Sequence, residues 1–300
     1  MKGHGSESSR QTTVTAVKGH GSESSRQKTI TAVQDHQKRM KRRQFLVQTG
    51  LTLGSVAACG GRQTNQVSQG RALMVAAAAS LQDALGEVAL LEQPGDRPPL
   101  RYTFGGSGTL QRQIEQGAPV DLFLAAAPFP LDALERQGLL WAGSRRNLLG
   151  NSLVLIVPQN SPELTGFQDL GRDRPPSLAL GNPATVPAGY YGEAVLRYFG
   201  FYDRLQPHLI WAQDVRQVLA YVATGNVEGG LVYGTDAQVN GAVRRVAVAP
   251  PESHAPIVYP GAVLQASGQR QQALAFLDFL GQPPAQSVFR RYGFGIVPGV

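Results

Sequence analysis

The sequence is poor in three features that would point to other kinds of protein: cysteine, lysine beyond its first segment, and long apolar runs. Its single cysteine, Cys59, excludes a disulfide within the chain and a cysteine-based metal site. Residues 1–59 contain ten Lys or Arg and three acidic residues, whereas residues 60–300 contain 18 Arg, no Lys and 18 Asp or Glu. The larger part is formally neutral despite the net charge of +7 for the whole chain, so we predict no nucleic-acid partner.

The motifs of several enzyme classes are also missing. No G-x-x-x-x-G-K-[ST] sequence occurs, and "FGGSG" (104–108) departs from G-x-G-x-x-G, so nucleotide binding lacks support. There is no G-x-S-x-G elbow, and the neighbours Ser253 and His254 do not by themselves make a catalytic triad. We therefore predict a protein without catalytic residues or metal-ion ligands. A hydrolase and a purely structural surface lipoprotein are the distant alternatives.

Two copies of one polar sequence open the chain, "KGHGSESSRQTTVTAV" (2–17) and "KGHGSESSRQKTITAV" (18–33). Two units are too few to bury the core of a solenoid, which takes about three or more. We therefore predict that residues 1–39 are a disordered leader.

A secretory signal is predicted over residues 40–58. It has a basic start and an apolar stretch from Phe45 that is too short to span a bilayer, and small residues precede Cys59. "RRQFL" resembles a twin-arginine export signal, and "VAAC" resembles the lipobox of bacterial lipoproteins, in which the cysteine becomes the acylated first residue. We predict lipidation of Cys59, a polar tether over 59–71, and a membrane-anchored protein in the periplasm or another extracytoplasmic space. A soluble secreted protein with a free cysteine is the alternative.

Beyond the tether, short apolar runs alternate with segments of helical periodicity. Strands are predicted at 72–79, 121–127, 151–158, 178–181 and 228–234, and helices at 80–91, 131–140, 188–200 and 214–225. This alternation indicates an α/β fold with a parallel sheet covered on both faces. About 230 residues are many for one such sheet, which favours two lobes.

In such folds ligands bind beyond the carboxyl ends of strands, where helices begin. The loop "FGGSGTL" (104–110) places glycines and Ser107 at such a point, where the first N–H groups of a helix can face an anion. Three further helix starts stand out, at Ser80, Ala188 and Val215, and the segment "GGLVYGTDA" ends a strand at Tyr233. Taken singly, each also has a structural explanation, such as a serine that caps its helix.

Taken together, the order and the sequences of these segments resemble those of the periplasmic molybdate-binding proteins of ABC importers. The resemblance runs from about 72 to 295 and is carried by "AAAASLQDAL", "FGGSGTLQRQIEQGAPVDLFLAA", "LALGNPATVPAGYYGEAVL" and "QDVRQVLAYVATGNVEGGLVYGTDA". It implies a two-lobed periplasmic-binding-protein fold of a type II-like kind, in which each lobe is a sheet flanked by helices and the ligand lies in the cleft between the lobes. We expect the chain to cross from one lobe to the other at "NSLVLIVP" and to return at "HAPIVYPGAVL". We therefore predict lobe 1 at 72–150 plus 256–300 and lobe 2 at 151–255.

The resemblance also implies the ligand and its contacts. Molybdate, and tungstate with it, would be bound as the oxyanion, without a cofactor, and delivered by a monomer to the permease subunit of the importer. The implied contacts are the hydroxyls and N–H groups of Ser80 and Ser107, the N–H groups of Ala188 and Val215, and the hydroxyl of Tyr233. The same scaffold with sulfate or thiosulfate as its ligand is the alternative.

Two details of these motifs bear on affinity. A common form of the family has serines at the positions of Gly106 and Gly108, so a hydroxyl beside Ser107 is missing here. The only cationic side chain in the five motifs is Arg216, which we expect to point along its helix and away from the cleft. A site made only of uncharged donors favours a fully ionised oxyanion over monohydrogen phosphate, whose own O–H would meet another donor.

Overall fold

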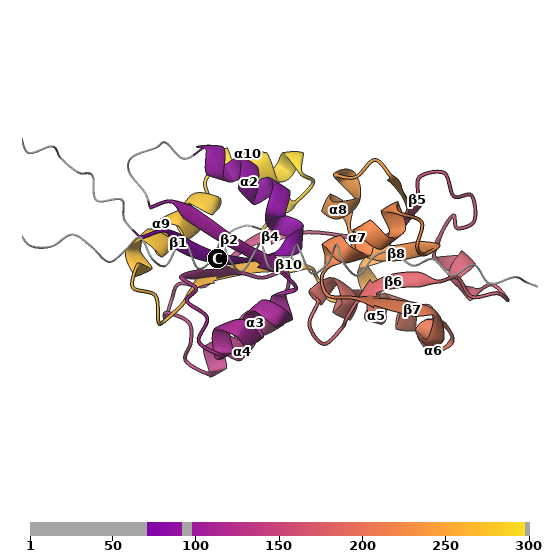
Figure 1. Ribbon diagram of the computed structural model, residues 1–300, viewed down its shortest axis with the longest axis horizontal. Coiled ribbons are helices and arrows are strands. Elements are labelled where there is room, and N and C mark those ends of the chain that lie inside the picture. Colours follow the sequence, from indigo (N-terminus) through magenta and orange to yellow (C-terminus); the bar gives the residue numbers. More distant parts are fainter. Residues whose placement is uncertain (1–70, 92–97, 298–300) are drawn as a thin grey trace, which may run out of the picture. The chain divides into compact units, whose positions relative to one another are not determined.

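The computed structural model describes residues 71–91 and 98–297, which Figure 1 shows in colour. The predicted leader, the predicted signal and Cys59 lie outside the described residues, as does all of the predicted tether except Arg71. All five predicted contact residues lie within them. No helix in this part of the chain is long and apolar enough to cross a membrane.

Within the described residues, the first sheet has six strands in the order β11-β4-β10-β3-β1-β2. Its strands are β1 (Leu73–Ala78), β2 (Leu100–Gly105), β3 (Leu122–Leu124), β4 (Arg146–Gly150), β10 (Val258–Val263) and β11 (Gly295–Ile296). β1 is parallel to β2 and β3, whereas β10 runs antiparallel to β3 and β4, and β11 antiparallel to β4.

In the same part of the chain, the second sheet has five strands in the order β7-β6-β8-β5-β9. Its strands are β5 (Leu153–Pro158), β6 (Leu178–Gly181), β7 (Leu209–Ala212), β8 (Gly229–Tyr233) and β9 (Val243–Val248). β6 is parallel to β7 and β8, but β5 is antiparallel to β8 and β9. Both sheets are therefore mixed, and the prediction of a parallel sheet is wrong in this respect. A strand buried on both faces is an apolar run whichever way it points, so the sequence of β5 did not encode its direction.

Helices cover both sheets. Those of the first sheet are α2 (Gln82–Leu91), α3 (Ser107–Glu115), α4 (Pro128–Arg136), α9 (Arg270–Leu280) and α10 (Pro283–Arg291). Figure 1 shows α2 and α10 on one side of this sheet and α3 and α4 on the other. Those of the second are α5 (Pro187–Tyr198), α6 (Tyr202–Leu205), α7 (Val215–Ala223) and α8 (Gly234–Gln238). Short 3₁₀ turns complete the chain at η1 (Ala79–Leu81), η2 (Phe167–Gly171), η3 (Gln206–His208) and η4 (Pro251–Ser253). We call each sheet with its helices a lobe.

Local chemistry explains why some elements differ from the predicted ranges. α4 begins at Pro128, because a proline fits the first turn of a helix, and ends before Gly138, whose φ of +68° breaks the helix. β9 was not predicted because its sequence, "VRRVAV", contains two arginines. It forms an edge of the second sheet, where charged side chains stay solvated and block further strand pairing.

Between residues 98 and 297, the chain passes between the two sheets at two places. Asn151 and Ser152 join β4 to β5, and residues 249–257 join β9 to β10. Asn151 is held by its side-chain amide, which donates to the hydroxyl of Thr235 at 3.0 Å and to that of Tyr259 at 3.2 Å. Thr235 lies in α8 of the second lobe and Tyr259 in β10 of the first. The first crossover is therefore tied to both lobes.

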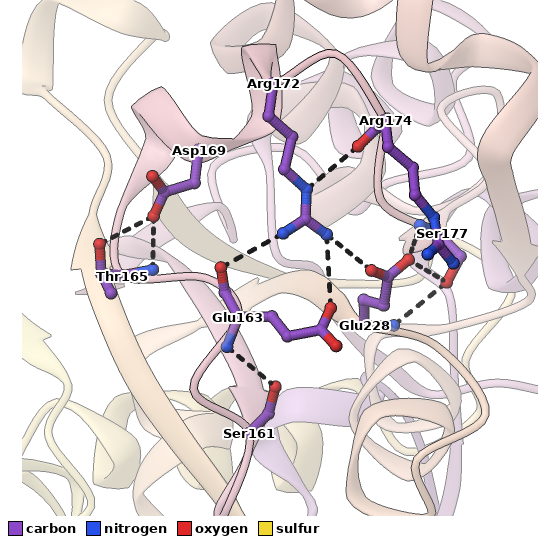
Figure 2. Close-up of polar contacts among 8 residues, drawn as sticks. All are labelled: Ser161, Glu163, Thr165, Asp169, Arg172, Arg174, Ser177 and Glu228. Atoms are coloured by element: carbon purple, nitrogen blue, oxygen red, sulfur yellow. Dashed lines mark hydrogen bonds and ion pairs between the residues drawn. The ribbon is translucent and has the colours of Figure 1, made fainter.

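Within the second lobe, Arg172 organises the loop that leads from η2 to β6. Its guanidinium donates to the carboxylate of Glu228 at 2.6 Å and to the carbonyls of Arg174 and Glu163 at 3.1 and 3.3 Å. Glu228 also accepts from the backbone N–H of Ser177 at 2.7 Å. Figure 2 shows this network, in which every partner belongs to the second lobe.

Candidate functional site

The five predicted contact residues line one cavity. Its walls are Ala78, Ala79, Ser80, Gly105, Gly106, Ser107, Ala126, Val186, Pro187, Ala188, Val215 and Tyr233. The cavity is tight, since it leaves about 10 Å³ for the centre of a water molecule, roughly the room that one water needs. Its lining combines residues of both lobes and includes no charged side chain.

The strands and helices explain how four of these residues present backbone N–H groups. Ser80 lies in η1 directly after β1, and Ser107 opens α3 directly after β2. Ala188 is the second residue of α5, and Val215 is the first residue of α7. The first four N–H groups of a helix have no acceptor inside the helix, and the helix dipole places partial positive charge there. The cavity is thus a place where several such positive ends meet.

The two serine hydroxyls can act as donors toward the cavity. Ser107 Oγ accepts a hydrogen bond from the N–H of Ala126 at 3.0 Å, which leaves its own proton available. Ser80 Oγ lies 3.0 Å from the hydroxyl of Tyr259. Because that hydroxyl already accepts from Asn151, it can donate its proton to Ser80, and Ser80 then keeps its own proton for a ligand.

Tyr233 ends β8 with its side chain only 1 % exposed. Its hydroxyl donates to the carbonyl of Ala126 at 3.4 Å, a long hydrogen bond that a ligand oxygen could replace. Burial raises the pKa of Tyr233 well above its ordinary value, so the hydroxyl keeps its proton and remains a donor at neutral pH. A bond to a carbonyl is also what a purely structural tyrosine makes, so the binding role of Tyr233 stays a prediction.

The glycines of the 104–110 loop have a steric role that the sequence did not reveal. The N–H of Gly108 donates to the carbonyl of Thr185 at 2.8 Å, across the two lobes. A Cβ atom on Gly108 would lie 2.8 Å from Thr185 Cα, and one on Gly106 would lie 2.7 Å from the carbonyl oxygen of Gln213. Serine at either position would therefore not fit this arrangement. The two glycines allow the lobes to approach this closely.

Arg216 does not line the cavity, which agrees with the expectation that it points away from it, but its guanidinium contacts carboxylates of two other helices. Its Nε lies 2.7 Å from Asp236 Oδ1, and its Nη2 lies 2.7 Å from Asp83 Oδ2. These are ion pairs by distance, since the N–H directions do not give linear hydrogen bonds. Burial raises the pKa of the fully buried Asp236 to about 7, although Arg216 opposes the shift.

Sequence reasoning missed Ala126, which lines the cavity. It also missed Asp83 and Asp236, which contact Arg216, and Tyr259, which contacts Ser80. The one available signal was Arg216 itself, because an arginine in a motif without other cations needs a carboxylate partner once it is buried. Over residues 71–91 and 98–297, no group of three or more His, Cys, Asp or Glu side chains is placed to hold a metal ion.

Two sheets joined by two crossovers, with a cavity walled by helix starts of both lobes, are the architecture of an extracytoplasmic solute-binding protein. The chain belongs to the family of bacterial extracellular solute-binding proteins, whose model matches residues 73–295. This confirms the predicted class and the two-lobed fold.

Two relatives and one solved structure show which members of this family the chain is similar to. A Bacillus subtilis (strain 168) protein, named as the ABC transporter substrate-binding lipoprotein YvgL, is 39% identical over 80% of this chain and 92% of its own length. The molybdate-binding protein ModA of Escherichia coli (strain K12) is 37% identical over 75% of this chain and 89% of its own. The substrate-binding domain of a molybdenum ABC transporter from Clostridium difficile superposes with a TM-score of 0.59 at 36% identity, over 75% of this chain and 98% of that domain.

Proposed function

We propose that this protein binds molybdate outside the cytoplasm and delivers it, as a monomer without catalytic activity, to the permease of an ABC importer. The observation that carries the proposal is the cavity, where helix starts of both lobes and three protonated hydroxyl groups converge without any cationic side chain in its lining. The 37% identity to a protein named for molybdate binding supports the choice of ligand.

The proposed contacts are the hydroxyls and N–H groups of Ser80 and Ser107, the N–H groups of Ala188 and Val215, and the hydroxyl of Tyr233. Hydrogen bonds to a charged group contribute about 1.5–3 kcal/mol each, so several are needed to replace the water around a dianion. Uncharged donors suffice because the helix starts supply partial positive charge. Tungstate, which has nearly the same size and charge, fits the same donors.

The same donors discriminate by protonation state. Molybdate and sulfate are fully ionised at neutral pH and can accept at every oxygen. Monohydrogen phosphate carries an O–H that would face a donor of the site, which leaves a buried donor unpaired at a cost of about 1–3 kcal/mol. Rejection of phosphate is therefore part of the proposal.

A second candidate ligand is a smaller tetrahedral anion, sulfate or thiosulfate. The observation in its favour is the tightness of the cavity, with room for about one water molecule. Sulfate is smaller than molybdate, so a tight cavity favours it.

We also propose the boundaries and anchoring that the sequence predicts. Lobe 1 is assigned to 72–150 plus 256–300 and lobe 2 to 151–255, because β4 and β10 join one sheet and β5 and β9 the other. The mature chain would begin at a lipidated Cys59, which agrees with the word lipoprotein in the name of the Bacillus relative. Intact mass of the native membrane-extracted protein tests this, and a soluble native species that begins near Arg71 would refute it.

Isothermal titration of the full chain with molybdate, tungstate, sulfate, thiosulfate and phosphate tests the ligand. We expect tight binding of molybdate and tungstate and none of phosphate. Preference for sulfate or thiosulfate over molybdate would establish the second candidate. If none of the five anions gives a heat of binding, the proposal is wrong.

A further inference from the structure

One ion cluster joins the two lobes beside the cavity. Asp83 lies in α2 of the first lobe, whereas Arg216 and Asp236 lie in α7 and α8 of the second. Arg216 contacts both carboxylates at 2.7 Å, so the contact with Asp236 is within one lobe and the contact with Asp83 is between lobes. The Asp83 side chain is 40% exposed, whereas Asp236 is fully buried.

The position of this cluster relates it to the proposed contact residues. Asp83 follows Ser80 by one helical turn, and Arg216 directly follows Val215. Ser80 and Val215 line opposite walls of the same cavity, one from each lobe. An ion pair between Asp83 and Arg216 therefore sets the separation of the two walls. It acts outside the cavity, which neither side chain lines.

We propose that Asp83 and Arg216 form an interlobe latch that stabilises the closed form and so raises the affinity for the oxyanion without contacting it. This inference rests on the proposed function. Asp236 holds the guanidinium from within the second lobe, so that Arg216 is already oriented when Asp83 approaches. Asp83 and Arg216 are positioning residues for the binding step.

The energetic reason is a population effect. A ligand that needs both lobes binds only the closed form, so its apparent dissociation constant rises as the closed fraction falls. The Asp83–Arg216 pair exists only when the lobes are together, and its loss lowers that fraction. The Asp83 side chain is 40% exposed although its Oδ2 is buried, so screening is partial and we expect a moderate effect, about two- to fivefold in affinity.

The chain offers a matched control on the same helix. Glu87 lies one turn after Asp83 in α2 and pairs with Arg291 of α10, so both partners belong to the first lobe. Its side chain is 36% exposed, similar to that of Asp83. Glu87→Gln removes the same charge from the same helix but breaks no contact between lobes.

The test measures molybdate affinity by titration and the ligand-free melting temperature for Asp83→Asn, Glu87→Gln and the wild type. We expect Asp83→Asn to weaken molybdate binding about two- to fivefold, and its melting temperature to equal that of Glu87→Gln. Glu87→Gln should bind molybdate like the wild type. In an Arg216→Lys background, Asp83→Asn should cost less than it does alone. Equal affinities of the two single variants would overturn the latch.

Failure of the proposed function gives a different result. If the wild type binds no molybdate but binds another anion, the same comparison is made with that anion. If it binds none, the latch is judged by X-ray scattering of the ligand-free protein. Asp83→Asn should then increase the radius of gyration relative to Glu87→Gln, and an unchanged radius would overturn the latch.

Discussion

Two of the arginine–carboxylate pairs in the second lobe are chemically alike but differ in the pKa of the carboxylate. Arg172 lies 2.6 Å from Glu228, and Arg216 lies 2.7 Å from Asp236. Partial burial raises the pKa of Glu228, but hydrogen bonds from Ser177 and the charge of Arg172 outweigh it, so this pKa lies below its ordinary value. Burial dominates at Asp236 and raises its pKa to about 7.

The surroundings of the two carboxylates explain the difference. Glu228 is 25% exposed and accepts from the N–H and hydroxyl of Ser177 as well as from Arg172, as Figure 2 shows. Asp236 is fully buried, and its arginine is shared with Asp83 of the other lobe. A salt bridge inside one lobe is therefore a stabilising element. A salt bridge shared between lobes depends on closure of the lobes. Mutation of the first kind should change stability, and mutation of the second kind should change ligand affinity.

Tyr233→Phe is expected to have the largest effect on affinity. It removes one hydroxyl at the cavity, which should weaken molybdate binding by about 1.5–3 kcal/mol, roughly ten- to a hundredfold. The ligand-free melting temperature should barely change, because the hydrogen bond to Ala126 is long at 3.4 Å. Titration and thermal melting of the same variant measure both quantities. Tyr191→Phe is the control, since Tyr191 is equally buried but does not line the cavity.

If Tyr233 is only a core residue, the order reverses. The ligand-free variant then loses stability, and the affinity for molybdate stays within a factor of about two of the wild type. That outcome would remove Tyr233 from the site.

Gly108→Ala should also act on affinity rather than stability. The added Cβ would lie 2.8 Å from Thr185 Cα and so keep the lobes apart. Overpacking costs about 1–3 kcal/mol, which predicts roughly five- to a hundredfold weaker binding. Gly86→Ala is the control, because a Cβ there meets nothing within 4 Å. Titration of both variants with molybdate tests this prediction. Equal affinities would show that this close approach of the lobes is not needed for binding.

Arg172→Ala should show the opposite behaviour. It removes several hydrogen bonds within the second lobe, and we expect the partly exposed site to lose about 1–2 kcal/mol of unfolding free energy. This lowers the melting temperature by about 3–6 °C and leaves molybdate affinity unchanged. Arg174→Ala is the matched control, since Arg174 takes part in the network through its carbonyl. A loss of affinity in Arg172→Ala would contradict the distinction between the two pairs.

The last prediction concerns the pH dependence of stability. The folded state of the wild type keeps a proton on Asp236 up to about pH 7, which the unfolded state releases near its ordinary pKa of 3.8. Asp236 therefore makes stability fall as pH rises from about 4 to 7, by roughly 1 kcal/mol per pH unit between the two pKa values. Glu228 acts with the opposite sign, because its lowered pKa makes stability fall as acid protonates it below about pH 4.5.

Asp236→Asn should remove the first dependence and Glu228→Gln the second. Denaturant unfolding at several pH values between 3 and 8 measures both slopes. An unchanged slope between pH 5 and 8 in Asp236→Asn would show that the buried carboxyl is not the group responsible.

Local signals explain what could be predicted from the sequence. The strand at 178–181 coincides with β6, because a buried apolar run ends there at a glycine. The helix at 214–225 contains α7, whose N-cap Asp214 accepts from the N–H of Gln217. Five candidate contact residues were selected because helix starts after buried strands are recognisable locally, and the structure brings them to one cavity.

The unpredicted features depend on residues that are far apart in the chain. Whether β5 pairs in a parallel or antiparallel way depends on its neighbours β8 and β9, not on its own apolar run. The partner of Arg216 is set by where α2 of the first lobe lies, and the fit of Gly108 by where Thr185 lies. Such information appears only once the two lobes are folded and placed against each other.

The use of backbone N–H groups in the proposed site has a consequence for its evolution. A side-chain donor disappears with one codon change, but an N–H group at Ala188 or Val215 persists in every substitution except proline. Drift at these positions can therefore adjust the width of the cavity and yet keep its preference for anions. A new ligand preference would arise in this scaffold by moving helix starts or changing Ser80, Ser107 and Tyr233, which makes oxyanion binding a durable trait and the choice among oxyanions the variable one.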